Sequence, residues 1–262
     1  IGDPVSATVN KEDGKTIIPE KVGVQFDVEE ARSIIGDGSA ESYTIPITTT
    51  AVKVTAEDLK AKLFQDTLAQ TSTSLDESNV ARTNNVRLAA ASINGTILNP
   101  GDEFSYNTVV GERTEARGYR PAGAYVNGQV VDEFGGGGCQ PSSTLYMAVL
   151  RADLEVTERH NHSFTVAYTP LGEDATVDYG NLDFRFKNNT DYPIKILAEQ
   201  TDGKMIMTIV GTKTSDKSVE TRTEVLETYT PQTIEKKDSS MMAGQTRVDT
   251  TPITGYSTRT YK

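Results

Sequence analysis

The only cysteine of the 262-residue chain has the setting of a reactive thiol. Cys139 follows four glycines, Gly135 to Gly138, here called the glycine loop, and precedes a stretch that predicts a helix. Backbone N–H groups and the helix dipole at a helix N-terminus favour the thiolate, which is the nucleophilic form of cysteine. We therefore expect Cys139 at a helix N-terminus. The alternative is a small buried cysteine beside glycines that only permit a tight turn.

The two histidines of the chain, His160 and His162, follow that helix on a predicted strand. Residues two apart on a strand point to one face, so either imidazole could serve as the base for the thiol. Glu158 shares this face and could orient an imidazole, or it could be an exposed strand carboxylate. The other candidates for a third member of a triad are Asp174, Asp178 and Asp183.

Polar residues near the glycine loop form a candidate binding set. Arginine recognises carboxylates through two parallel hydrogen bonds, and N–H groups of the 138–140 turn could stabilise an oxyanion. The alternative for the arginines is ordinary surface ion pairing, and for the tyrosine a place in the core. The candidates are Arg113, Tyr119, Arg120, Gly137, Gly138, Gln140 and Arg159.

Composition excludes several classes of protein. A net charge of −11 and a pI near 4.8 argue against a nucleic-acid partner. One cysteine cannot form an internal disulfide or a zinc site of several thiolates, and no third ligand follows the two histidines. We therefore predict no metal and no cofactor. No run approaches the roughly 18 apolar residues of a membrane helix, and no signal peptide opens the chain, so we expect any membrane anchor outside this sequence.

The first block of the chain, residues 1–78, predicts a small α/β unit. A helix is expected over 28–35, with Asp27 as its N-cap and Gly36 at its end. Residues 67–79, rich in serine and threonine, predict a linker or an extended edge strand. The strands are expected at 6–9, 16–18, 44–50 and 51–54, and a short helix or turn at 55–59.

The second block, residues 79–212, predicts two helices against an antiparallel sheet, which is an α+β domain. Apolar residues three and four apart predict a helix over 83–93, and a second helix runs from Cys139 to about Arg151. Asp202-Gly203 predicts a hairpin turn. The strands are expected over 154–159, 164–168, 182–186, 194–198 and 205–210.

The third block, residues 213–262, has no helical period. Alternation over 224–229 predicts a strand. We therefore predict a small all-β module at this end of the chain.

Motifs on both sides of the cysteine carry a family resemblance. They include Asn99-Pro100-Gly101-Asp102-Glu103-Phe104, Gly118-Tyr119-Arg120, the glycine loop with Cys139, and Leu182-Asp183-Phe184-Arg185-Phe186. In their residues and in their order along the chain, these motifs resemble the VanW family over residues 84–210. The first block resembles part of a peptidoglycan-binding domain, and the third resembles a surface module named for its five glycines.

The resemblance implies an extracellular protein at the cell surface or cell wall of a Gram-positive bacterium. Such a protein would interact with peptidoglycan or its precursors and would be linked to vancomycin resistance. The alternative is a cysteine acyl-transferase or peptidase that acts on peptidoglycan stem peptides with Cys139 and His160 or His162. A third possibility is a scaffold that performs no chemistry.

Overall fold

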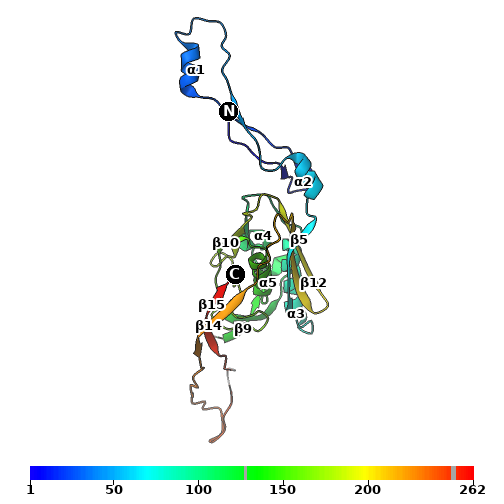
Figure 1. Ribbon diagram of the computed structural model, residues 1–262. Coiled ribbons are helices and arrows are strands. Elements are labelled where there is room, and N and C mark those ends of the chain that lie inside the picture. The colour runs from blue at the N-terminus through cyan, green and yellow to red at the C-terminus, as the bar shows by residue number, and fades with distance from the viewer. Residues whose placement is uncertain (127–128, 249–251) are drawn as a thin grey trace.

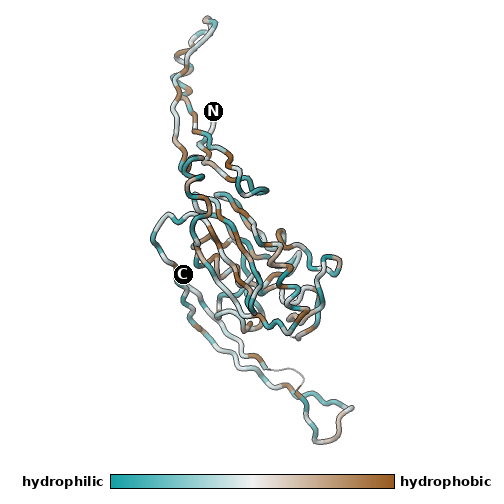
Figure 2. The backbone as a smooth tube through the Cα atoms, turned by 90° about the vertical axis from the view of Figure 1, so that its right-hand side faces the viewer, coloured by the Kyte–Doolittle hydropathy of each residue, from teal (hydrophilic) through white to brown (hydrophobic). Residues whose placement is uncertain are grey.

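The computed structural model describes residues 1–126, 129–248 and 252–262. An elongated N-terminal unit extends from one end of a central domain, and a two-stranded ribbon extends from the other (Figure 1). Hydrophobic residues occur along much of the length of the strands in the central domain (Figure 2). Within the described ranges, no helix has the length and apolar character needed to span a membrane.

The N-terminal unit contains two helices and two pairs of short antiparallel strands. Asp27 accepts hydrogen bonds from the N–H groups of Glu29 and Glu30, so the predicted helix and its cap are confirmed. The strand predicted over 51–54 is wrong, because Val54 instead accepts a single backbone hydrogen bond from Ala7. The elements are β1 (Thr8–Val9), β2 (Ile17–Ile18), β3 (Gly23–Gln25), α1 (Val28–Ile35), β4 (Thr48–Thr50) and α2 (Ala56–Lys62).

The central sheet has four antiparallel strands in the order β5-β13-β12-β6. The edge-strand interpretation of residues 67–79 is confirmed, because β5 pairs with β13 along its length. The predicted hairpin turn is also confirmed: Asp202 and Gly203 have positive φ angles, as a tight turn between paired strands requires. The strands are β5 (Asp66–Ser74), β6 (Ile97–Leu98), β12 (Ile194–Thr201) and β13 (Lys204–Gly211).

Two helices cover this sheet, as predicted. α3 (Val80–Ile93) packs on β12, and α5 (Cys139–Arg151) packs on β13 and β5. Residues 140–150 of α5 are all buried, which makes this helix the centre of the domain. The core around it includes Val86, Ile93, Leu145, Val149, Ile196, Met205 and Met207.

A second, smaller sheet lies against α5 and explains why both faces of that helix are buried. Its strand order is β10-β11-β7, and Phe104 of β7 stacks on Phe186 of β11 with ring centroids 5.0 Å apart. Phe184 meets Tyr146 of α5 edge to face at 5.6 Å. The strands are β7 (Glu103–Ser105), β10 (Glu155–Glu158) and β11 (Arg185–Lys187).

Several elements differ from the predictions. The strand predicted over 164–168 is wrong: the segment is irregular, and Thr165 bonds through its hydroxyl to the carbonyl of Thr254 instead of joining a ladder. The sequence patterns also missed a hairpin that leads into the glycine loop and two short helices. These elements are α4 (Tyr106–Val110), η1 (Glu115–Arg117), β8 (Pro121–Val126) and β9 (Gln129–Phe134).

The C-terminal ribbon pairs β14 (Arg222–Tyr229) with β15 (Gly255–Tyr261) in antiparallel register. The chain then returns to the central domain, where the ammonium group of Lys262 lies 2.8 Å from the Asp153 carboxylate. The hydroxyl of Thr260 donates to the carbonyl of Gly172 at 3.1 Å. The described part of this block is thus all-β, while the block boundaries proposed above stay predictions.

Gly136 offers a direct test of the packing between the glycine loop and β8. A Cβ atom at this position would lie 2.0 Å from the carbonyl oxygen of Ala122, a backbone atom that cannot swing away. We expect Gly136→Ala to lower the free energy of unfolding by about 1–3 kcal/mol, measured by denaturant titration. Gly2→Ala is the matched control, because a Cβ at Gly2 meets nothing within 4 Å. Equal stability of the two variants would contradict this packing.

Candidate active site

The glycine loop brings the chain from β9 into α5 in a conformation that suits glycine. Gly135 and Gly137 have φ angles of +81° and +93°, a region that side chains disfavour. Arg113 lies directly over the loop, so a Cβ on Gly135 would lie 2.5 Å from the Cβ of Arg113. The glycines therefore permit both the turn and the close approach of the segment that contains Arg113.

Asn85 of α3 also holds the glycine loop in place, through hydrogen bonds to backbone groups. Its amide donates to the carbonyls of Arg120 and Gly136 at 2.8 and 3.0 Å, and its carbonyl accepts the N–H of Arg120 at 2.8 Å. Asn85 is fully buried, so these bonds form away from water. These buried hydrogen bonds therefore fix the position of the glycine loop and, with it, the start of α5.

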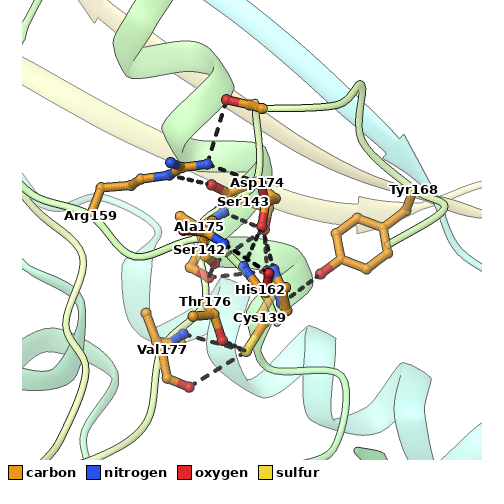
Figure 3. A network of polar contacts seen from close by, with 12 residues as sticks. Cys139, Ser142, Ser143, Arg159, His162, Tyr168, Asp174, Ala175, Thr176 and Val177 are labelled. Atoms are coloured by element: carbon orange, nitrogen blue, oxygen red, sulfur yellow. Dashed lines mark hydrogen bonds and ion pairs between the residues drawn. The ribbon is translucent and has the colours of Figure 1, made fainter. Parts of the chain in front are cut away.

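Cys139 is the first residue of α5, which confirms the predicted position at a helix N-terminus. The thiol is half-buried and faces the extended segment that contains Thr176 and Val177 (Figure 3). The sulfur accepts the N–H of Val177 at 3.5 Å and lies 3.6 Å from the hydroxyl oxygen of Thr176. The sulfur also lies 3.5 Å from the carbonyl oxygen of Val177, to which a protonated thiol would donate.

His162 lies between the sulfur and the carboxylate of Asp174. Its Nδ1 lies 2.7 Å from Oδ2 of Asp174, and its backbone N–H donates to the same oxygen at 2.7 Å. Nδ1 therefore carries a proton, and the imidazole lies near enough to the Cys139 thiol to lower its pKa. The structure thus selects Asp174 from the carboxylates that the sequence left open.

Arg159 binds the other oxygen of the Asp174 carboxylate. Its guanidinium donates to the backbone carbonyl of Asp174 at 2.7 Å and to Oδ1 at 3.0 Å. The guanidinium also lies over the ring of Tyr146, 5.2 Å from the centroid. The aspartate therefore has one oxygen for the imidazole and one for the arginine.

The electrostatics of Cys139 and His162 favour an ion pair. Burial by itself would raise the pKa of the Cys139 thiol, but the hydrogen bond and charge of His162 outweigh it and lower the pKa to about 7. Burial would lower the pKa of His162, whereas its bonds to Asp174 and Cys139 raise it to about 9. Between these values the site holds a thiolate beside an imidazolium.

His160 takes no part in this arrangement. Its Nε2 lies 3.0 Å from a carboxylate oxygen of Glu158. The prediction that both histidines share one strand face is wrong, because β10 ends at Glu158 and His160 forms only an isolated bridge to Thr176. The chain then leaves the strand, and this departure carries His162 to the sulfur.

The predicted binding residues fall into two groups. Arg113 and Arg159 reach the site, since the Arg113 guanidinium lies 3.5 Å from the carbonyl of Val177. Gln140 is buried, and its amide is used within the protein, on Thr73, Ser74 and Arg82. Tyr119 is in the core, where burial raises its pKa. The Arg120 side chain is exposed.

Tyr168 is a site residue that the sequence patterns did not indicate. Its hydroxyl lies 3.5 Å from Nε2 of His162, and its ring meets the imidazole edge to face at 6.4 Å. The Arg82 guanidinium lies 5.9 Å from the centroid of the same ring. No local signal could have found Tyr168, because it belongs to an irregular loop that only the tertiary fold brings to Cys139.

A hollow of about 470 Å³ is lined in part by His162 and Asp174. The loop around residues 163–172 forms one wall, and the C-terminal ribbon forms the other with Tyr229 and Tyr256. The hydroxyl of Thr169 is buried at this wall and has no hydrogen-bond partner among the described residues. In the same part of the chain, no group of three metal-binding side chains is close enough to hold an ion.

The fold and the site together define an α+β protein in which a cysteine at a helix N-terminus lies beside a histidine that is hydrogen-bonded to an aspartate. The chain belongs to the VanW-like protein family, whose model matches residues 81–210. The resemblances of the two flanking blocks to wall-associated modules stay predictions.

Two curated relatives support this assignment. The chain is 37% identical over 211 residues to the uncharacterized protein YoaR of Bacillus subtilis (strain 168), which covers 79% of this chain and 69% of that protein. It is 30% identical over 134 residues to the vancomycin B-type resistance protein VanW of Enterococcus faecalis (strain ATCC 700802 / V583), covering 49% of each. The match therefore spans about half the length of VanW. No solved structure matches the chain significantly.

The pH dependence of alkylation tests the ion pair. The rate with iodoacetamide follows the thiolate fraction, so it should rise with pH around a midpoint near 7. His162→Ala removes the stabilising charge and leaves the effect of burial, so the midpoint should move above about 8.5. His160→Ala is the matched control and should keep the parent midpoint. An unchanged midpoint in His162→Ala would contradict the pairing.

The two histidines also allow a direct titration of the base. In a His160→Ala background the remaining imidazole should titrate near pH 9 by NMR, since Asp174 and Cys139 both stabilise its protonated form. Adding Asp174→Asn removes one of these partners, so the midpoint should fall. A midpoint near 6.5 before that second change would show that the imidazolium is not stabilised.

Proposed function

We propose that this protein is a cysteine acyl-transfer enzyme, which cleaves or transfers an acyl group at the amide bonds of peptidoglycan stem peptides. The observation that carries the proposal is the placement of His162 between the Asp174 carboxylate and the Cys139 thiol. This arrangement supplies a nucleophile, a proton carrier and a group that orients the carrier.

The proposed reaction uses the ion pair as its starting state. The Cys139 thiolate attacks the carbonyl carbon of the substrate, and the π electrons of the carbonyl move onto its oxygen. The tetrahedral intermediate collapses, the carbon–nitrogen bond breaks, and the His162 imidazolium gives its proton to the leaving amine. The neutral imidazole then removes a proton from water or an acceptor amine, which attacks the thioester and releases Cys139.

A purely structural role accounts poorly for this cluster. Burying ionisable groups costs desolvation energy, which a core of apolar residues would avoid. The side chains of His162 and Asp174 are only 10% and 12% exposed, yet they form an ion pair with each other beside a cysteine, and Asp174 also pairs with Arg159. Buried ionisable groups with shifted pKa values beside a nucleophile are typical of active sites.

The substrate class and the location are supported by the family. VanW carries vancomycin resistance in its name, and the low cysteine count suits a Gram-positive surface protein, in which cysteines are often avoided. We therefore place the proposed activity at the cell surface or cell wall of a Gram-positive bacterium, with peptidoglycan or its precursors as the partner. The acidic net charge makes nucleic acid an unsuitable partner.

Intact-protein mass spectrometry tests the nucleophile. With p-nitrophenyl acetate as the probe, we expect one acetyl group on the parent protein, attached to Cys139, with a burst of p-nitrophenol. Cys139→Ala should not be acetylated at this peptide, and His162→Ala should be acetylated at least 100-fold more slowly at pH 7. His160→Ala should behave as the parent. Absence of a thioester on the folded parent protein would contradict an acyl-transfer role.

A second candidate function is binding to the wall without chemistry. The specific observation in its favour is the hollow beside His162, with the unpaired buried hydroxyl of Thr169 at its wall. Co-sedimentation with purified peptidoglycan sacculi tests it. If the protein only binds, Cys139→Ala should co-sediment as the parent does, and neither protein should release peptides from the sacculi. Release of peptides by the parent alone would favour the enzyme.

A further inference from the structure

Tyr168 is a polar group beside the reactive pair that the proposed mechanism leaves unused. Its hydroxyl lies 3.5 Å from Nε2 of His162 (Figure 3). Arg82 lies over its ring, and His162 packs against the ring from the side. The hydroxyl is therefore held beside the reactive pair.

The acyl-transfer mechanism needs hydrogen-bond donors for the oxyanion, and the glycine loop offers few. The N–H groups of Gly138 and Gln140 already donate to the carbonyls of Gly135 and Gly137, at 2.9 and 3.0 Å. In the described parts of the chain, the N–H of Cys139 donates to no backbone carbonyl. The three donors expected from the 138–140 turn are thus reduced to one.

The Gln140 side chain cannot supply the second donor. Its amide donates to the hydroxyl of Thr73 at 3.0 Å and to the carbonyl of Ser74 at 2.8 Å, inside the protein. An oxyanion site generally uses at least two donors in a place that excludes water. The nearby donors that remain are the hydroxyl of Tyr168 and the guanidinium of Arg113, whose Nη1 has no hydrogen-bond partner among the described residues.

We propose that Tyr168 is a catalytic residue whose hydroxyl, together with the N–H of Cys139, stabilises the oxyanion of the tetrahedral intermediate. This inference rests on the proposed acyl-transfer function and deepens it. As the C–S bond forms, the carbonyl oxygen gains the π electron pair and accepts the two hydrogen bonds. When the leaving group departs, the pair re-forms the C=O bond, and both donors keep their protons.

The protonation state of Tyr168 agrees with this role. Burial raises the pKa of its hydroxyl far above the ordinary value, and the negative charge of the nearby Cys139 thiolate raises it further. The hydroxyl therefore stays protonated across the range from about 7 to about 9 in which the thiolate and imidazolium coexist. A hydroxyl that keeps its proton can donate throughout the reaction.

Comparison of two reactions of the same sulfur tests the role of Tyr168. Attack on p-nitrophenyl acetate forms an oxyanion, whereas displacement of iodide from iodoacetamide forms none. We expect Tyr168→Phe to slow acetylation of Cys139 about 100-fold relative to alkylation. The ratio of the two rates is the readout, because a loss of folded protein would reduce both rates equally.

Two further variants complete the design. Tyr168→His keeps a donor at this position and should restore part of the ratio, which covers the case in which Tyr168→Phe folds poorly. Tyr192→Phe, a tyrosine beside Lys62 of α2, is the matched control and should keep the parent ratio. The melting temperature of each variant reports whether the fold is retained.

The outcomes separate this inference from the proposed function. If the parent protein is acetylated but Tyr168→Phe keeps its ratio, the hydroxyl is not an oxyanion donor. If Tyr168→Phe speeds both reactions, the hydroxyl only shields the sulfur, and the inference is also overturned. If the parent protein is alkylated but never acetylated, the acyl-transfer function itself fails, and Tyr168 has no oxyanion to stabilise.

Discussion

The hydrogen bond between the Asp174 carboxylate and His162 is the interaction on which the site depends. It fixes the tautomer of the imidazole and supplies the negative charge that keeps the ring protonated. Without this charge, burial would disfavour the imidazolium and hence the thiolate beside it. Arg159 in turn balances the charge of the carboxylate, so that the pair can exist with little exposure to water.

Helix α5 fixes the position of Cys139 relative to the segment that carries Asp174. Cys139 begins this helix, and Ser142 and Ser143, one turn later, bond to the backbone of Ala175. The segment that carries Asp174 is thus tied to the helix that begins at Cys139. Because α5 is buried between the four-stranded sheet and the smaller sheet, neither half can shift without disturbing the core.

The C-terminal ribbon is part of the surroundings of the site. Thr221 at its start bonds to the buried carboxylate of Glu173, which also pairs with Arg151 at 2.8 Å. Gly172, Glu173 and Asp174 are consecutive, so contacts between the ribbon and this segment act one residue away from the aspartate of the site. The ribbon also supplies one wall of the adjoining hollow, which makes it a structural partner of the central domain.

Short-range signals in the sequence determined much of the fold. The Asp27 cap, the apolar spacing of α3, the Asp202-Gly203 turn and the start of α5 at Cys139 each depend on neighbouring residues, and each was predicted correctly. The sequence also limited the chemistry to one thiol and two histidines. Only the tertiary structure selected His162, Asp174 and Tyr168. Their positions depend on where β10 ends and on how the loop between residues 163 and 172 packs against the ribbon, and no local periodicity encodes contacts between segments so far apart along the chain.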